Sequence, residues 1–150
     1  MSTALHLAGP DDLAPLLKLV TAFHAEMQIE QADETRQNAI YPLLDGSPYG
    51  VCYLAGPRRA PIGYVVVTFG WSVEFGGLDA FIDEIFIRPG VRRRGVGGDV
   101  LSALPKALAS AGIRAFHLEV DKQDTDTQRL YARAGFERRD RYTLMTRRVS

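Results

Sequence analysis

The sequence of 150 residues carries 18 Lys and Arg against 18 Asp and Glu, so its formal net charge is zero. That zero is a cancellation, because residues 1–87 hold 4 basic and 11 acidic side chains whereas residues 88–150 hold 14 basic and 7 acidic ones. The asymmetry suggests an anionic partner for the C-terminal part and a cationic one for the N-terminal part. Hydrophobic residues make up 46% and charged residues 24%, which argues against a disordered, collagen-like or coiled-coil chain.

The length fits one domain over residues 1–150, which buries roughly 68–70% of its unfolded surface. Cys52 is the single cysteine, so an intramolecular disulfide and a cysteine zinc cluster are excluded, and we expect a buried, inert thiol. His6, His24 and His117 stand singly without metal-ligand spacing, so no metal is expected. The sequence shows neither a signal-peptide pattern nor the roughly 18 apolar residues of a membrane span, and we expect a cytoplasmic protein without membrane contact.

The residue pattern in the first half of the chain predicts three strands and two helices. Residues 5–7 alternate and form a short strand before Gly9-Pro10. Apolar residues recur at helical spacing from residue 13 to about 29, and residues 35–44 form a second, weaker helix. Residues 51–55 and 62–69 read as two strands joined by a tight turn.

The second half predicts three further strands and two helices. Residues 80–87 read as a central strand, followed by a glycine-rich turn and a helix over 95–111 that Pro105 kinks. Residues 116–120 form the next strand. A capping box that starts at Thr125 opens a short helix ending at Gly135. Residues 142–146 form a closing hairpin strand.

Two carboxylates, Asp83 and Glu84, lie in the middle of the strand predicted over residues 80–87. Charge is costly in a central strand unless a functional site uses it. Successive side chains on a strand point to opposite faces of the sheet. We therefore expect only one of these two carboxylates to face a cleft.

The turn between that strand and the next helix has the composition of a phosphate site. Glycines allow backbone N–H groups to converge, the N-terminus of a helix favours an anion, and arginines donate to phosphate oxygens. The sequence is not a Walker loop or a dinucleotide fingerprint, because Val96-Gly97 and Val100 break those patterns. The alternative is a tight connection with solvated arginines. The residues of the turn are Arg92, Arg93, Arg94, Gly95, Val96, Gly97 and Gly98.

Three segments together carry a resemblance. They read IDEIFIRPGVRRRGVGGDVL, LEV at residues 118–120 and LYARAGF at residues 130–136. In this order and spacing, the chain resembles the GNAT superfamily of acetyl-CoA-dependent N-acetyltransferases. The resemblance covers residues 62–146 by motif and implies an α+β (α/β) fold, with a mixed, twisted central sheet of about six to seven strands flanked by about four helices.

The resemblance also implies a cofactor site for acetyl-CoA. Backbone groups of Ile85, Phe86 and Ile87 pair with the pantetheine arm, and the amides of residues 93–98, flanked by Arg92, hold the pyrophosphate. Asp124 stands where the family often carries an asparagine near the cofactor, seven residues before Tyr131.

For the chemistry, the resemblance implies direct transfer of acetyl to an amine. Tyr131 matches the family's tyrosine, which protonates or hydrogen-bonds the departing sulfur of CoA and also contacts the cofactor. Three carboxylates are candidates for the base: Glu84 first, Glu119 second and Asp83 third. A structural salt bridge to an arginine is the competing interpretation for each of them.

The sequence therefore favours an N-acetyltransferase acting on a small primary amine, a polyamine-like or aminoglycoside-like compound, or a protein or peptide amine. From the charge asymmetry we expect a cationic acceptor, and from the family resemblance a homodimer. The alternative is a catalytically silent CoA-binding module of the same fold. Binding of nucleic acid is disfavoured, since no stripe of interleaved aromatic and basic residues is present.

Overall fold

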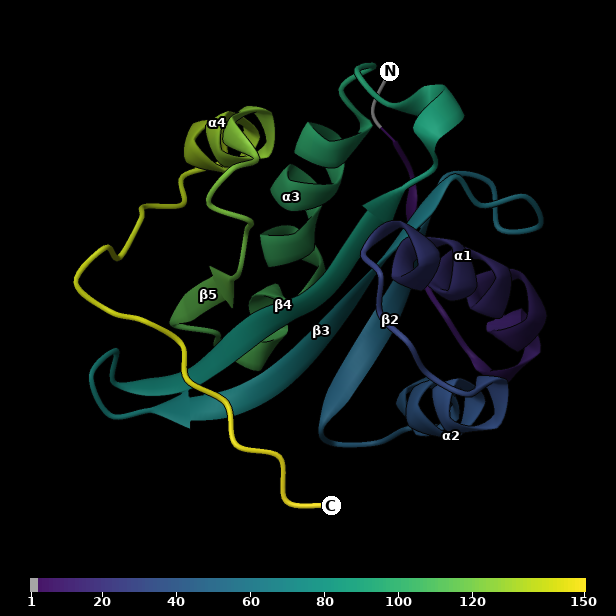
Figure 1. Ribbon diagram of the computed structural model, residues 1–150, viewed down its shortest axis with the longest axis horizontal. Coiled ribbons are helices and arrows are strands. Elements are labelled where there is room, and N and C mark those ends of the chain that lie inside the picture. Colours follow the sequence, from purple (N-terminus) through teal and green to yellow (C-terminus); the bar gives the residue numbers. More distant parts are fainter. Residues whose placement is uncertain (1–2) are drawn as a thin grey trace.

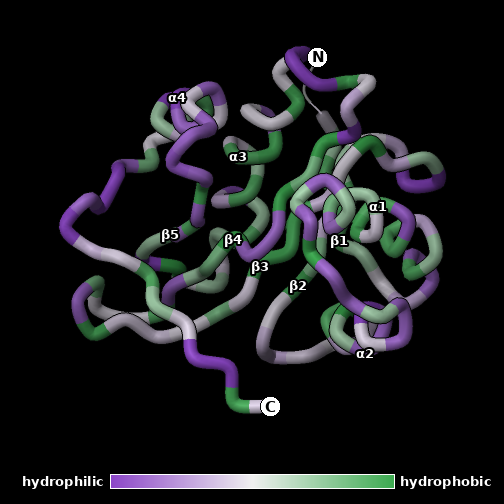
Figure 2. Tube along the Cα trace, viewed as in Figure 1, coloured by the Kyte–Doolittle hydropathy of each residue, from purple (hydrophilic) through white to green (hydrophobic). Residues whose placement is uncertain are grey.

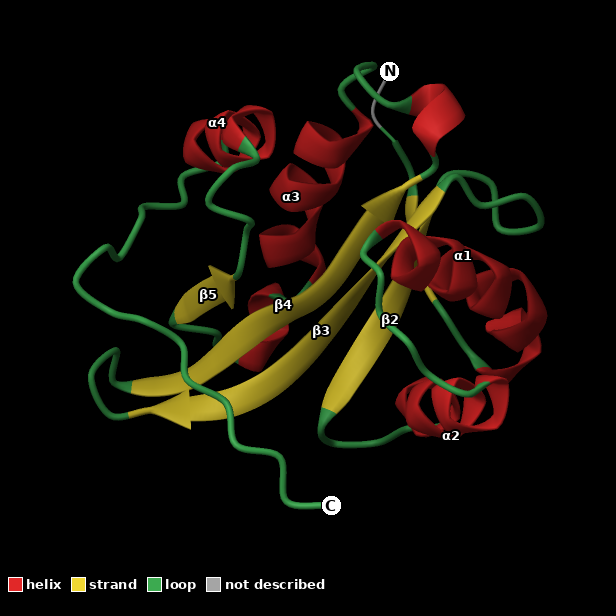
Figure 3. Ribbon diagram, in the orientation of Figure 1, coloured by secondary structure: helices red, strands yellow, loops and turns green. Residues whose placement is uncertain are grey.

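The structure, a computed structural model, describes residues 3–150. Its five strands form one sheet in the order β1-β2-β3-β4-β5 (Figures 1 and 3). Neighbours from β1 to β4 are antiparallel, and β5 lies parallel to β4. The elements are β1 (Leu5–Leu7), α1 (Leu13–Glu26), α2 (Asp33–Leu44), β2 (Gly50–Ala55), β3 (Gly63–Ser72), β4 (Gly77–Ile87), α3 (Val96–Ala107), β5 (Ala115–Leu118) and α4 (Thr125–Arg133). This arrangement confirms the α+β class and the mixed sheet, with five strands in the described part of the chain.

Side chains alternate across the sheet into two separate cores, because successive residues of a strand face opposite sides. Apolar side chains of α1 and α2 pack on one face, and those of α3 and α4 pack on the other. Figure 2 shows hydrophobic residues along the middle of the sheet, whereas α4 and the chain after it are largely hydrophilic. Tyr64 and Phe86 lie in the first core, and Tyr131 lies in the second.

The prediction of a strand over residues 142–146 is wrong. Within the described residues, no helix or strand follows α4, and the chain runs as coil past the β3–β4 hairpin (Figure 1). A strand needs a partner for its backbone groups, and strand-forming residues alone do not supply one. Met145 is 89% exposed. The coil is held by Arg139, which binds Glu74 at 2.9 Å and lies over the rings of Phe75 and Tyr142.

The predicted helix over residues 95–111 is shorter than expected. The α-helix α3 ends at Ala107, two residues after Pro105, and a turn of 3₁₀ helix follows at Ala109–Ala111. Proline removes one intrahelical hydrogen bond and clashes with the preceding turn, so it favours an early end of the helix.

Candidate active site

The middle of β4 contains one residue more than the segment of β3 with which it pairs. Glu84 and Ile82 pair with consecutive residues of β3, which leaves Asp83 as a β-bulge. As a result, Ile82 and Ile85 both pack on the α3 side although they are three positions apart. The expected alternation at Asp83 and Glu84 is therefore wrong, because a bulge sets two residues against one. Burial, followed by the charges of Glu84 and Asp83, raises the pKa of Cys52 on the α1 side.

Glu84 lies where α1 crosses the sheet, and both of its carboxylate oxygens have a partner. The Tyr64 hydroxyl donates to Oε1 at 2.8 Å, and Nε2 of His24 is 2.7 Å from Oε2. The Glu84 side chain is 17% exposed and that of His24 is 7% exposed. Burial, followed by the charge of Glu84, raises the pKa of Tyr64, so this phenol keeps its proton and remains a donor.

Helix α2 adds a buried cation to this cluster. The Nε of Arg36 donates to Nδ1 of His24 at 3.0 Å, while its Nη1 binds Asp33 at 2.8 Å. The Arg36 side chain is 8% exposed. The sequence did not predict these residues as part of the site. Tyr64 and His24 contact Glu84, and Arg36 contacts His24, from elements that are distant in the sequence.

The other two candidate bases lie nearby on the same side of the sheet. Glu119 follows the end of β5 and is exposed. Partial desolvation and the charges of Glu84 and Glu119 raise the pKa of Asp83. Further along the strands, Asp79 contacts His117 at 3.1 Å. These strands thus carry a row of carboxylates, of which Glu84 is the most enclosed.

The edge of β4 opens beyond the short strand β5. Pairing with β5 covers only residues 79–82 of β4. In the described part of the chain, residues 84–87 pair with β3 on one side, and neither these residues nor Asp83 pair with a strand on the other. An unpaired strand edge presents N–H and C=O groups that an extended ligand can engage.

Among the residues predicted to bind the pantetheine arm, two point outward at this edge. The Arg88 N–H donates to the carbonyl of Ile62, just before β3, at 2.8 Å. Alternation then turns the backbone groups of Phe86 toward β3 and those of Ile85 and Ile87 toward the open edge. The Ile87 carbonyl already accepts a bond from Nε of Arg92 at 2.7 Å. The outward backbone groups that Arg92 does not contact are the N–H and C=O of Ile85 and the N–H of Ile87.

The turn after β4 leads into α3 through two left-handed residues. Arg93 has φ 63° and Gly95 has φ 80°, a combination that turns backbone N–H groups inward as in anion-binding nests. Gly95 is the N-cap of α3. A Cβ at Gly97 would come within 3.2 Å of Leu130 on α4, so this glycine allows close packing of the two helices. Val96 is buried.

The arginines of the turn differ in their surroundings. Arg92 forms two hydrogen bonds to the Glu26 carboxylate, at 2.7 and 2.6 Å, and lies over the Phe86 ring. The bond to Arg92 lowers the pKa of Glu26. Arg92 therefore joins the turn to the end of α1, while Arg93 and Arg94 are exposed.

Tyr131 lies on α4 with its ring in the second core, 6.1 Å from the ring of Phe136. Burial, followed by the charge of Asp124, raises its pKa to about 12. Asp124 caps α4, since its carboxylate accepts bonds from the Thr127 N–H at 3.1 Å and from the Thr127 hydroxyl at 2.6 Å. The predicted capping box at Thr125 is therefore wrong by one residue, because aspartate is the stronger N-cap.

Several other expectations concern groups outside this cluster. Cys52 is fully buried, which confirms its expected burial, and this burial raises its pKa to about 12. Among residues 3–150 there is no cluster of side chains suited to a metal ion. The described part also contains no helix long and apolar enough to cross a membrane.

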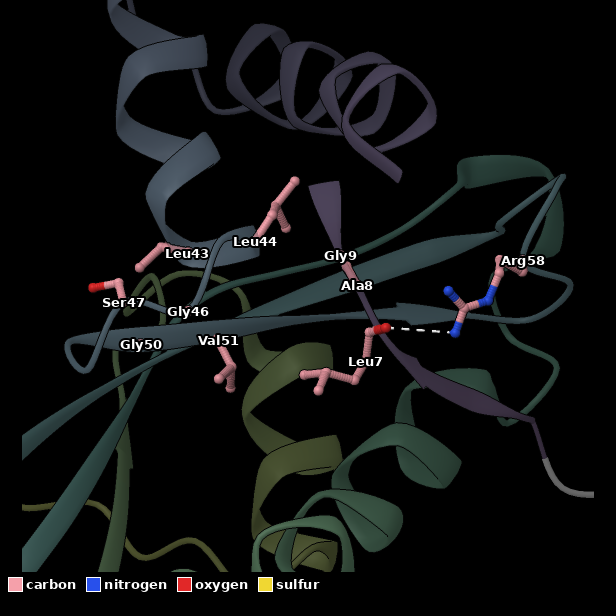
Figure 4. Close-up of a pocket in the computed structure, with 10 residues that line it drawn as sticks. All are labelled: Leu7, Ala8, Gly9, Leu43, Leu44, Gly46, Ser47, Gly50, Val51 and Arg58. Carbon is pink, nitrogen blue, oxygen red and sulfur yellow. Dashed lines mark hydrogen bonds between the residues drawn. The ribbon is translucent and has the colours of Figure 1, made fainter. Parts of the chain in front are cut away.

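A shallow cavity of about 350 Å³ lies apart from the candidate site, at the edge formed by β1 and β2 (Figure 4). Leu43 and Leu44 line it from the end of α2, and Arg58 closes one end, where it reaches the Leu7 carbonyl. It includes none of the predicted catalytic residues.

Comparison with known proteins gives a consistent result. Residues 16–136 match the model of the acetyltransferase (GNAT) family, whereas no curated protein matches significantly. An integron cassette protein from the mobile metagenome of Cole Harbour Salt Marsh is 29% identical, with a TM-score of 0.84 over 97% of this chain and 91% of that one. A protein of Arthrobacter sp. FB24 assigned as an acetyltransferase is 30% identical, with a TM-score of 0.76 over 89% and 85%. An aminoglycoside acetyltransferase from an uncultured soil metagenomic sample, in complex with sisomicin, shares the fold at 14% identity, with a TM-score of 0.78 over 99% and 97%.

Proposed function

Because this chain belongs to the acetyltransferase (GNAT) family, we propose that it transfers the acetyl group of acetyl-CoA directly to an amine acceptor. The observation that carries the proposal is the alignment of three features on one strand. The open edge of β4 begins at the bulge, Glu84 lies beside that bulge, and the left-handed turn into α3 follows the end of the strand.

Acetyl-CoA fits this strand as an added edge. The outward backbone groups of Ile85 and Ile87 are suited to the amides of the pantetheine arm. The amides of residues 93–98 would bind the pyrophosphate at the N-terminus of α3, where the helix dipole favours an anion. Exposed Arg93 and Arg94 add positive charge. Arg92 contributes by joining this turn to α1 through Glu26.

The transfer needs a base for the amine and an acid for the leaving thiolate. Glu84 takes one proton from the protonated amine, directly or through a water molecule, and the nitrogen lone pair that is thereby freed attacks the thioester carbonyl. The C–S bond then breaks, the thiolate of CoA takes the proton of Tyr131, and the second proton lost by the acetylated nitrogen returns to the Tyr131 phenolate. The raised pKa of Tyr131, about 12, keeps that proton on the phenol at neutral pH. Glu119 is the second candidate for the base and Asp83 the third.

The acceptor site inferred from this geometry favours a cation. Asp79, Asp83, Glu84 and Glu119 lie along β4 and just after β5, on the side of the sheet that carries Glu84, and opposite charge attracts a protonated amine. We therefore propose a cationic amine: a small polyamine-like or aminoglycoside-like compound, or a protein or peptide amine. The proposal includes a homodimer, which rests on family resemblance alone, and a cytoplasmic location, which rests on the sequence pattern alone.

The test combines binding with turnover. Calorimetry measures acetyl-CoA binding, and release of free CoA thiol is then followed across cationic, neutral and acidic amines. We expect binding, thiol release with cationic amines, and a loss of about 10²–10⁴ in kcat for Glu84→Gln. Glu119→Gln is the matched control, because it removes one charge from the same face of the sheet and leaves Glu84, the proposed base, unchanged.

Three other results would redirect the proposal. A chain that folds but does not bind acetyl-CoA refutes it. Binding without thiol release for any amine supports the silent CoA-binding module instead. A larger loss in Glu119→Gln than in Glu84→Gln transfers the role of base to Glu119.

A further inference from the structure

A continuous line of hydrogen bonds runs from the surface of α2 to the middle of the sheet. It connects Asp33, Arg36, His24, Glu84 and Tyr64 in that order, with distances of 2.8, 3.0, 2.7 and 2.8 Å. Asp33 is exposed, whereas the side chains of Arg36 and His24 are nearly inaccessible to solvent. The middle of the line is therefore shielded from water, so the position of each proton depends on the neighbouring side chains and not on solvent.

The position of the His24 ring proton follows from Arg36. A guanidinium stays protonated in proteins and has only donors, so its Nε–H must find an acceptor at Nδ1 of His24. Nδ1 then carries a lone pair, and the single proton of a neutral imidazole lies on Nε2. That N–H donates to Oε2 of Glu84 at 2.7 Å. A doubly protonated ring would place an N–H against the N–H of Arg36.

We propose that Arg36 and His24 are positioning residues: Arg36 keeps the His24 ring neutral, and the Nε2–H of that neutral ring holds the Glu84 carboxylate in one orientation. The inference rests on the proposed function, in which Glu84 is the base. Each carboxylate oxygen has two lone-pair sites, and Tyr64 and His24 occupy one on each oxygen. The remaining sites can receive the proton of the amine.

A neutral histidine leaves Glu84 more basic than an imidazolium would, because an adjacent positive charge favours the ionised carboxylate and weakens its attraction for a proton. Without Arg36, no N–H faces Nδ1 of His24, so the ring can take a second proton there and form an ion pair with Glu84. The charged or titratable groups around His24 and Glu84 are Arg36, Tyr64, Asp83 and Cys52. The Arg36→Leu variant should therefore have a lower kcat than the wild type.

The direct test is nitrogen NMR of the His24 ring in the free protein at neutral pH. The wild type should show a proton on Nε2 and none on Nδ1. Arg36→Leu should gain a proton on Nδ1. Asp33→Asn is the matched control, because it removes a charge partner of Arg36 but leaves the Nε contact, and its spectrum should match the wild type. A proton on Nδ1 in the wild type overturns the proposal.

Kinetics of two His24 variants test the positioning role without changing Arg36. The amide of His24→Gln can still donate to Oε2, whereas His24→Leu cannot. We expect kcat of His24→Leu to fall about 10–100-fold, kcat of His24→Gln to stay within about tenfold of the wild type, and KM for acetyl-CoA to stay unchanged in both. Equal loss in the two variants overturns the positioning role.

The two arms separate this inference from the proposed function. If Glu84→Gln is fully active, the proposed base is wrong, and the NMR experiment still decides the proton position in the free protein. If Glu84→Gln is inactive but His24 carries its proton on Nδ1, only the present inference fails. The wild-type spectrum and the two His24 variants suffice if Arg36→Leu does not fold.

Discussion

Replacing Tyr64 by phenylalanine isolates one hydrogen bond in the centre of the molecule. The ring is 1% exposed and packs in the first core, and its hydroxyl donates to Oε1 of Glu84 at 2.8 Å. Because Tyr64→Phe keeps the ring, the loss is confined to a hydrogen bond with a charged group, worth about 1.5–3 kcal/mol. We expect the free energy of unfolding to fall by this amount at neutral pH, and the melting temperature to fall by about 3–12 °C.

The difference between the two proteins should depend on pH in a defined direction. Burial and the charge of Glu84 raise the pKa of Tyr64 in the folded state, while in the unfolded chain a tyrosine ionises near pH 10. Above about pH 10 the unfolded wild type releases a proton that the folded wild type retains, so its stability falls by about 1.4 kcal/mol per pH unit from this group. The variant lacks this group. The stability difference should therefore be constant below about pH 10 and shrink above it.

Urea denaturation followed by circular dichroism, at neutral pH and at about pH 9, 10 and 11, measures this difference. Other groups titrate in both proteins and cancel in the comparison. Tyr49→Phe is the control, because Tyr49 is 76% exposed and its loss should leave stability unchanged. Equal stability of Tyr64→Phe and wild type at neutral pH, or a difference that widens above about pH 10, would refute the reasoning.

Three further predictions concern other parts of the molecule. Tyr131→Phe should lower kcat by about 10²–10⁴ with acetyl-CoA affinity nearly unchanged, as measured by steady-state kinetics and calorimetry; an unchanged kcat removes Tyr131 from the mechanism. Gly63→Ala should destabilise the fold by about 1–3 kcal/mol in thermal denaturation, because its Cβ would lie 2.4 Å from the Phe86 carbonyl oxygen; wild-type stability would show that β3 and β4 adjust without cost. Cys52, with a pKa raised to about 12, should react with a thiol reagent only as the protein unfolds in urea, and rapid labelling of the native protein contradicts its burial.

Local patterns in the sequence were sufficient for part of the fold. The turn from Arg92 to Gly98 consists of seven consecutive residues, and the helix that carries Tyr131 is likewise a short continuous segment. Both could therefore be predicted without tertiary information. The alternation of strands and helices was visible for the same reason, since hydrophobic periodicity is a property of neighbouring residues.

The hydrogen-bond network that contains Glu84 could not be predicted in this way. His24, Arg36 and Tyr64 come from α1, α2 and β3, and each has an ordinary interpretation in its own segment. A histidine on an amphipathic helix gives no indication of its partner 60 residues away. Only the crossing of α1 over the sheet brings these side chains together.

Two errors have the same physical origin. The strand expected over residues 142–146 failed because pairing is decided by what lies beside a segment, and propensity does not record this. The side of the sheet on which Asp83 and Glu84 lie could not be predicted, because a bulge is a property of two strands together. Neither neighbour is visible in the segment itself.

The bulge also has a consequence for insertions and deletions. Because Asp83 is the extra residue, the faces of β4 before and after it are offset by one position. Deleting Asp83 would restore simple alternation and keep Ile85 and Phe86 on their present sides, because the residues that flank the bulge already pair with consecutive residues of β3. Deleting a residue beyond the bulge would instead turn neighbouring side chains to the opposite face, since a shift of one residue exchanges the two sides of a strand. Loss of Asp83 should therefore be easier to tolerate than loss of a residue between Glu84 and Ile87.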